Sequence, residues 1–201
     1  MRPHTGGGAL PATTRFTDGM IVLGGGPWGS AGERDLPTLE SEIALTADCL
    51  ARGVPVIGIG LGAQILATAA GGGSEQCDLT FSVGEARRVQ DHALNGFLPE
   101  RFPMAVYMRD WPVPPDSARV LAQDGEGRPA LFQIDTNSFG FVGHPGVKLA
   151  MIEDLIMEFE ETPPSLEAGL SRLREAQTSI AHSLVPIMTG LIQVTGLMWP
   201  K

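Results

Sequence analysis

The chain has 201 residues and a formal net charge of −9, with 43% hydrophobic and 18% charged residues. This length suits one α/β domain with a substantial core. The negative charge argues against nucleic acid and anionic membranes as partners, because both require a basic surface. The two cysteines, Cys49 and Cys77, form neither a disulfide framework nor a metal-binding motif. We therefore expect no metal and no cofactor.

No apolar run reaches the roughly 18 residues of a membrane span. The N-terminus also lacks the apolar core of a secretion signal. A cytoplasmic location is therefore the expectation.

The N-terminal part of the chain predicts a strand, a helix and a second strand. Met20–Leu23 reads as a buried strand that runs into a glycine loop. Pro37 opens a helix over about residues 36–52, and Gly53 ends it in the left-handed conformation common after helices. Another apolar strand follows, and the β-α-β order calls for parallel strands with a right-handed crossover.

The stretch Val54–Leu66 is the most informative in the chain. A β-branched apolar run enters a glycine-rich turn at Gly60 and leaves as an apolar helix that includes Gln64. A strand, a tight turn and a helix in this order give the geometry of a nucleophile elbow, which displays one side chain above the sheet. Such a bend occupies a sparsely allowed backbone region, which glycine adopts without the usual cost of about 1–3 kcal/mol.

The second half predicts a β-rich region followed by helices. Short alternating runs at 79–83, 104–108, 118–121 and 130–134 read as strands. A helix is expected over about 148–159, and Pro163-Pro164-Ser165 caps a long helix to about His182. A final apolar stretch, Leu184 to Trp199, closes the chain. Its apolar stripe has to be covered by the body of the protein or by a partner, and comprises Ile187, Leu191, Val194 and Met198.

Three stretches resemble the class I glutamine amidotransferases. Residues 54–66 resemble the family's elbow, Gly-(Ile/Val)-Cys-Leu-Gly-x-Gln, and residues 18–25 resemble its Asp-Gly-(Leu/Ile)-Ile-(Val/Leu)-Leu-Gly-Gly strand. Residues 138–146 resemble its (Tyr/Phe)-Gly-Val-Gln-Phe-His-Pro-Glu motif. The resemblance implies a flavodoxin-like α/β fold, with a parallel or mixed sheet and flanking helices. It implies one domain over 1–201, with a core at about 8–160 and extra C-terminal helices at about 163–199.

The resemblance also implies a chain shortened at its N-terminus. Family members normally carry a first strand and helix before the strand that Met20–Leu23 resembles. If Met1 is the true start, this strand becomes an open edge with unpaired backbone groups. A homodimer, or a partner subunit that covers the Met20–Leu23 edge, would protect it.

The family's reaction needs a cysteine nucleophile, a histidine base, a carboxylate that orients the histidine, and backbone N–H groups for the oxyanion. By resemblance, Gly60 stands at the nucleophile position, His144 at the base and Gly146 at the carboxylate. The chain is therefore expected to be a degenerate member that lacks the Cys and the Glu. Met108 replaces the histidine of another family motif.

Further residues are candidates for contacts to a ligand: Gly25, Gly26, Trp28, Leu61, Gln64, Met108 and Arg109. Several have a structural interpretation as well. His144 can be a retained structural histidine or can contact a ligand or move a proton. Gln64 is expected to hydrogen-bond the loop around the bend. Arg109 reads as a surface or rim pair with Asp110 or, if it points inward, as a carboxylate or phosphate anchor. Trp28 can line the pocket or cover it, Cys49 is expected in the core, and Cys77 is a remote candidate for a substitute nucleophile.

These features predict a glutamine amidotransferase-like protein without glutaminase activity, a pseudoenzyme that binds a small molecule or a partner protein in a biosynthetic pathway. One alternative is a repurposed enzyme that uses His144 and the glycine loop after Met20–Leu23 for non-covalent chemistry on a carbonyl or amide substrate. In the family that this chain resembles, the N–H groups of this loop help to hold the oxyanion. A third possibility is a subunit whose missing parts are supplied by another chain.

Overall fold

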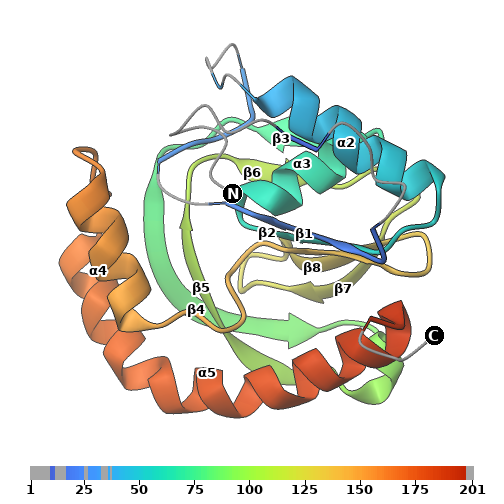
Figure 1. The fold of residues 1–201 in the computed structure, drawn as a ribbon. Coiled ribbons are helices and arrows are strands. Elements are labelled where there is room, and N and C mark those ends of the chain that lie inside the picture. Colours follow the sequence, from blue (N-terminus) through green and yellow to red (C-terminus); the bar gives the residue numbers. More distant parts are fainter. Residues whose placement is uncertain (1–9, 12–16, 25–26, 33–35, 37, 198–201) are drawn as a thin grey trace.

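A seven-stranded mixed sheet forms the centre of the computed structural model, which describes residues 10–11, 17–24, 27–32, 36 and 38–197 (Figure 1). The first three strands in spatial order are parallel, and the other four pair antiparallel. The spatial order is β1 (Met20–Leu23), β2 (Val56–Ile59), β9 (Ser138–Phe141), β8 (Pro129–Ile134), β7 (Arg119–Gln123), β4 (Thr80–Arg88) and β5 (Arg101–Met108). A separate ribbon pairs β3 (Gly73–Glu75) with β6 (Trp111–Val113).

Helices flank this sheet on both sides. Figure 1 shows α2 (Leu39–Ala51) and α3 (Leu61–Ala69) on one side and α5 (Leu166–Thr195) running along the other. The remaining helices are α4 (Leu149–Glu158) and a short 3-10 turn, η1 (Ala93–Gly96). This arrangement confirms the predicted α/β fold with a mixed sheet and flanking helices.

The parallel part of the sheet is built around β2, whose four residues are all buried. A continuous apolar run is typical of a parallel strand that is covered on both faces. The helix before it, α2, ends as predicted, since Gly53 has a φ of 66° and its N–H donates to the Leu50 carbonyl at 3.0 Å. Cys49 on this helix is fully buried, so its assignment to the core is confirmed. Pro37 lies outside the described residues.

Three glycines let α3 approach the parallel strands backbone to backbone. A Cβ on Gly24 would lie 2.3 Å from the Leu61 nitrogen, and one on Gly58 would lie 2.3 Å from the Gly62 carbonyl oxygen. A Cβ on Gly62 would lie 1.9 Å from the Val22 carbonyl oxygen. No side chain fits at these distances, so the glycines fix how closely the bend after β2 sits against β1.

Strand β1 is an edge strand of the described sheet, as expected. It pairs with β2 alone among the described strands. Its residues alternate in exposure, and Ile21 and Leu23 are each 60% exposed. The open edge and these two apolar side chains agree with the prediction of a covering partner, which itself stays a prediction.

The C-terminal region differs from the sequence prediction of two segments. A single 30-residue helix, α5, continues through Pro186. Proline removes only one N–H from the helical ladder, and the helix persists because the next turns are buried against the core through Ile187 and Leu191. These two residues confirm that the predicted apolar stripe is covered, while Met198 and Trp199 lie outside the described residues. In the part of the chain described, no helix is both long and apolar enough to cross a membrane.

Candidate functional site

The bend after β2 has the geometry of a nucleophile elbow. Gly60 has φ 61° and ψ −118°, a conformation that residues with a side chain rarely adopt. Its N–H donates to the Phe141 carbonyl at 2.9 Å, and its carbonyl accepts the Ala63 N–H at 2.9 Å. A Cβ on Gly60 would have no described atom within 4 Å. Hydrogen bonds between backbone groups thus hold Gly60 in this turn.

Gln64, one turn into α3, ties the surrounding loops to the bend. Its amide oxygen accepts hydrogen bonds from the Ser30 N–H at 2.9 Å and the Ser30 hydroxyl at 2.7 Å. Its amide nitrogen donates to the Arg109 carbonyl at 2.7 Å. The side chain is fully buried, so these contacts match the structural interpretation of Gln64. As a ligand contact Gln64 stays a prediction.

Arg109 and Asp110 are both withdrawn from the open surface. Asp110 is only 1% exposed, and its carboxylate accepts the Ala31 N–H at 2.9 Å and the Cys77 N–H at 3.1 Å. The Arg109 side chain is 13% exposed, and its Nε donates to the Pro27 carbonyl at 2.8 Å. The surface half of the interpretation was therefore wrong, and the rim position stays a prediction. Both side chains contact segments distant in the sequence, and both hold loops beside the bend.

His144 follows β9 and is held by backbone groups. Its own N–H donates to the Ala105 carbonyl at 3.0 Å, and its Nδ1 accepts the Gly146 N–H at 3.1 Å. An acceptor nitrogen carries no proton, so the neutral imidazole bears its hydrogen on Nε2. Burial lowers the pKa of His144 below its ordinary value of 6.5, although a backbone hydrogen bond acts in the opposite direction.

This burial predicts a pH-dependent contribution to stability. Because the pKa of His144 is lower in the folded chain, the unfolded chain takes up the proton more readily. The contribution of His144 is therefore complete above about pH 6.5 and is lost as the pH falls through the lower folded-state pKa. Urea unfolding at pH 7.5 and at pH 5 measures this contribution. Between these two pH values, the free energy of unfolding should fall more for the wild type than for His144→Asn, whose amide oxygen can still accept the Gly146 N–H. Equal losses would contradict this assignment.

The region around Gly146 is covered by α5. A Cβ on Gly146 would lie 3.1 Å and 3.4 Å from the two methyl carbons of Leu184. Leu184 belongs to the turn of α5 before Pro186. A larger side chain at residue 146 would have to push this leucine aside.

The remaining predicted residues lie in different environments. Leu61 and Met108 are 2% and 3% exposed, so their side chains belong to the interior. Trp28 packs edge-on against Phe159, with 5.2 Å between ring centroids. Gly25 and Gly26 lie outside the described residues. Burial, followed by Glu75 and Asp110, raises the pKa of Cys77, which keeps the thiol protonated and argues against a substitute nucleophile.

Sequence reasoning missed four residues that shape this region: Ser30, Tyr107, Glu161 and Leu184. Ser30, Glu161 and Leu184 contact residues far away in the sequence, and the buried Tyr107 hydroxyl has no hydrogen-bond partner among the described residues. No local pattern marks either feature. The described residues contain no group of three His, Cys, Asp or Glu side chains that could hold a metal ion.

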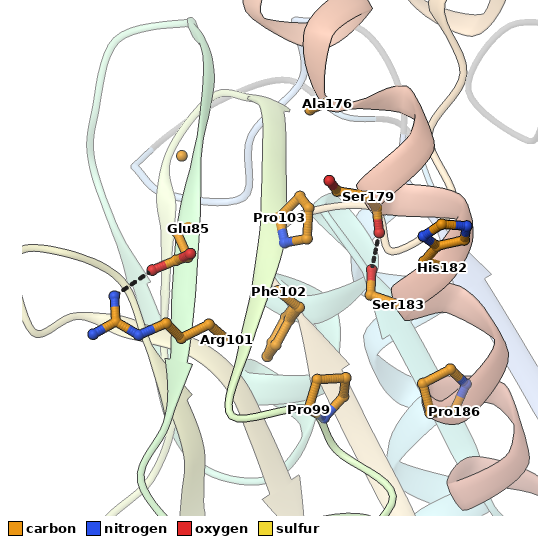
Figure 2. A pocket seen from close by; sticks show the side chains of 11 residues that line it. Glu85, Pro99, Arg101, Phe102, Pro103, Ala176, Ser179, His182, Ser183 and Pro186 are labelled. Carbon is orange, nitrogen blue, oxygen red and sulfur yellow. Dashed lines mark hydrogen bonds and ion pairs between the residues drawn. The ribbon is translucent and has the colours of Figure 1, made fainter.

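A separate open groove of about 520 Å³ lies between the β4–β5 hairpin and α5 (Figure 2). None of the predicted site residues lines it. Its α5 wall includes Ser183, whose hydroxyl donates to the Ser179 carbonyl at 3.0 Å. Glu85 and Arg101, on the strands, form an ion pair at 2.8 Å. The groove is therefore distinct from the region around Gly60.

Solved structures of two other proteins share this fold. A glutamine amidotransferase from Thermotoga maritima matches with a TM-score of 0.78 and 19% identity, over 94% of this chain and 83% of that one. A glutamine amidotransferase from Methylobacillus flagellatus matches with a TM-score of 0.77 and 21% identity, over 93% of this chain and 80% of that one. At these identities the similarity establishes the flavodoxin-like fold of the family alone.

The sequence itself matches one family. No curated protein sequence matches the chain. The family model for glutamine amidotransferase class-I matches residues 11–114, slightly more than half of the chain. This match spans β1 to β6 and includes the Gly60 bend, Gln64 and Arg109, but ends before His144. The chain therefore belongs to the class-I glutamine amidotransferase family.

Proposed function

We propose that this protein is a pseudoenzyme of the family, which binds a small molecule beside the Gly60 bend and does not hydrolyse glutamine. The main support is the bend itself. Gly60 keeps the backbone geometry of an elbow, with φ 61° and ψ −118°, at the position where related sequences carry the nucleophilic cysteine. A glycine has no group that can attack an amide carbon, so covalent catalysis at this position has no nucleophile.

The surroundings of His144 support the same proposal. In a relay, a ring N–H of the histidine donates a hydrogen bond to a carboxylate, which orients the ring. Here Nδ1 accepts the Gly146 N–H and has no hydrogen to offer. Residue 146 provides no carboxylate, and Leu184 lies over it. The Nε2–H remains a hydrogen-bond donor, a group suited to binding a ligand oxygen rather than to removing a proton.

The proposal predicts that restoring two side chains will not restore the reaction. The Gly60→Cys, Gly146→Glu double variant should release ammonia from glutamine at least about 100-fold more slowly than an intact family member assayed beside it, since a misplacement of about 1 Å can cost this factor. Adding Leu184→Ala should raise the rate, because it makes room for the carboxylate introduced at residue 146. The wild-type chain should release no ammonia above the buffer background.

Turnover by the wild-type chain would overturn this proposal. Ammonia release from glutamine, or from another amide, that disappears in His144→Asn would support the repurposed enzyme instead. Circular dichroism and thermal melting of each variant would show that a missing activity is not a loss of folding.

A further inference from the structure

We propose that Arg109 anchors a carboxylate-bearing small molecule, and that Glu161 occupies this anchor as an internal substitute that the ligand displaces. The proposal rests on the binding function proposed above and adds the chemical class of the ligand. It concerns described residues around the end of β5, the loop at Pro27 and the segment between α4 and α5.

The position of the Arg109 guanidinium is fixed by the protein. Its Nε donates to the Pro27 carbonyl at 2.8 Å, and the Arg109 backbone carbonyl accepts the Gln64 amide at 2.7 Å. The side chain is 13% exposed, so it is partly withdrawn from water. An arginine held in this way recognises a carboxylate with little further loss of side-chain entropy.

Glu161 pairs with the Nη2 edge of this guanidinium. The glutamate comes from the segment between α4 and α5, 52 residues away in the sequence, and its own side chain is 55% exposed. An ion pair with one solvent-exposed partner contributes little to stability. A ligand carboxylate that reaches the same edge in a bidentate geometry can therefore compete with Glu161.

Tyr107 offers a second donor beside Arg109. Tyr107 lies near the end of β5, and Arg109 directly follows the strand. Glu161 lies close to both, since it pairs with Arg109 and its charge acts on the Tyr107 hydroxyl. The Tyr107 hydroxyl is buried and has no hydrogen-bond partner among the described residues. A buried hydroxyl without a partner is unfavourable, and a ligand oxygen would satisfy it. Burial, followed by the Glu161 charge, raises the pKa of Tyr107, so this hydroxyl keeps its proton for donation.

Aromatic packing links the Glu161 segment to the same loop. Phe159, two residues before Glu161, packs on Trp28, which directly follows the Pro27 carbonyl that Arg109 binds. Displacement of Glu161 would remove one contact that holds this segment near the loop. Trp28 fluorescence can report that change.

Titration calorimetry with glutarate, a linear dicarboxylate, tests the proposal, with the uncharged diamide glutaramide as control. Glutarate should bind the wild type, and Glu161→Gln should bind it at least about threefold more tightly because the internal competitor is gone. Arg109→Met should weaken binding at least about tenfold, Arg109→Lys should be intermediate, and Tyr107→Phe should weaken it severalfold. Glutaramide should bind much more weakly than glutarate.

Glu85→Gln is the matched control. It removes the same charge from another ion pair, that with Arg101, and should leave the affinity unchanged. Equal glutarate affinity in the wild type, Glu161→Gln and Arg109→Met would overturn the proposal, as would the absence of binding to any of them. Glutarate should also shift the tryptophan emission of the wild type and leave the emission of Trp28→Phe unchanged. Glutamine hydrolysis by the wild type would instead overturn the pseudoenzyme, and would leave the competition between glutarate and Glu161 intact.

Discussion

Gly62→Ala should destabilise the protein by about 3 kcal/mol or more, at or beyond the upper end of the usual cost of overpacking. The added Cβ would lie 1.9 Å from the Val22 carbonyl oxygen and 2.6 Å from its carbon. Both contacts are to backbone, so no side-chain rotation can relieve them. Either α3 has to move away from β1, or the hydrogen bonds between β1 and β2 have to distort. Urea unfolding followed by circular dichroism measures the loss.

Gly84→Ala provides the control for this substitution. Gly84 lies in β4, has no positive φ, and a Cβ there would have no described atom within 4 Å. The alanine should leave stability unchanged or raise it by up to about 1 kcal/mol, because it restricts the unfolded chain. A Gly62→Ala protein as stable as Gly84→Ala would show that α3 and β1 are not in backbone contact.

Asp110→Ala should have the second large effect, also about 3 kcal/mol or more. The carboxylate is 1% exposed and accepts the Ala31 and Cys77 N–H groups, which come from two different segments. Hydrogen bonds to a charged group contribute about 1.5–3 kcal/mol each, and the substitution would leave two N–H groups without this acceptor. Asp110 also has a φ of 62°, which alanine tolerates less well than aspartate does.

Asp110→Asn separates these two causes. Asparagine tolerates a positive φ and keeps one acceptor oxygen. Asp110→Asn should therefore lose clearly less stability than Asp110→Ala. Thermal melting in one buffer should rank the wild type highest, Asp110→Asn next and Asp110→Ala lowest. Equal melting temperatures for the wild type and Asp110→Ala would contradict the bridging role of this carboxylate.

Local chemistry made much of the fold predictable. Gly53 and Gly60 both adopt the positive φ that their positions after a helix and after a strand suggested. The apolar run of β2 was identified because a buried parallel strand needs no alternation. Pro186 shows the limit of this reasoning: its local signal predicts a break, and burial of Ile187 and Leu191 overrides it.

The candidate site was less predictable because its contacts are not local. Asp110 reaches Ala31 across 79 positions, and Arg109 reaches Pro27 across 82. Adjacent residues of opposite charge suggest a pair with each other, but here each side chain contacts a different distant segment. Leu184 lies over Gly146 because of the path of α5, a helix that starts twenty residues after Gly146. No pattern within one segment carries that information.

The bend at Gly60 also limits which substitutions residue 60 can accept. Any residue with a side chain would have to accept φ 61° there, at a cost of roughly 1–3 kcal/mol, before it could offer a new reaction. A carboxylate at residue 146 would meet Leu184 at the same time. Neither change helps without the other, and the first one weakens the fold. The fold itself therefore favours glycine at residue 60 over any single substitution there.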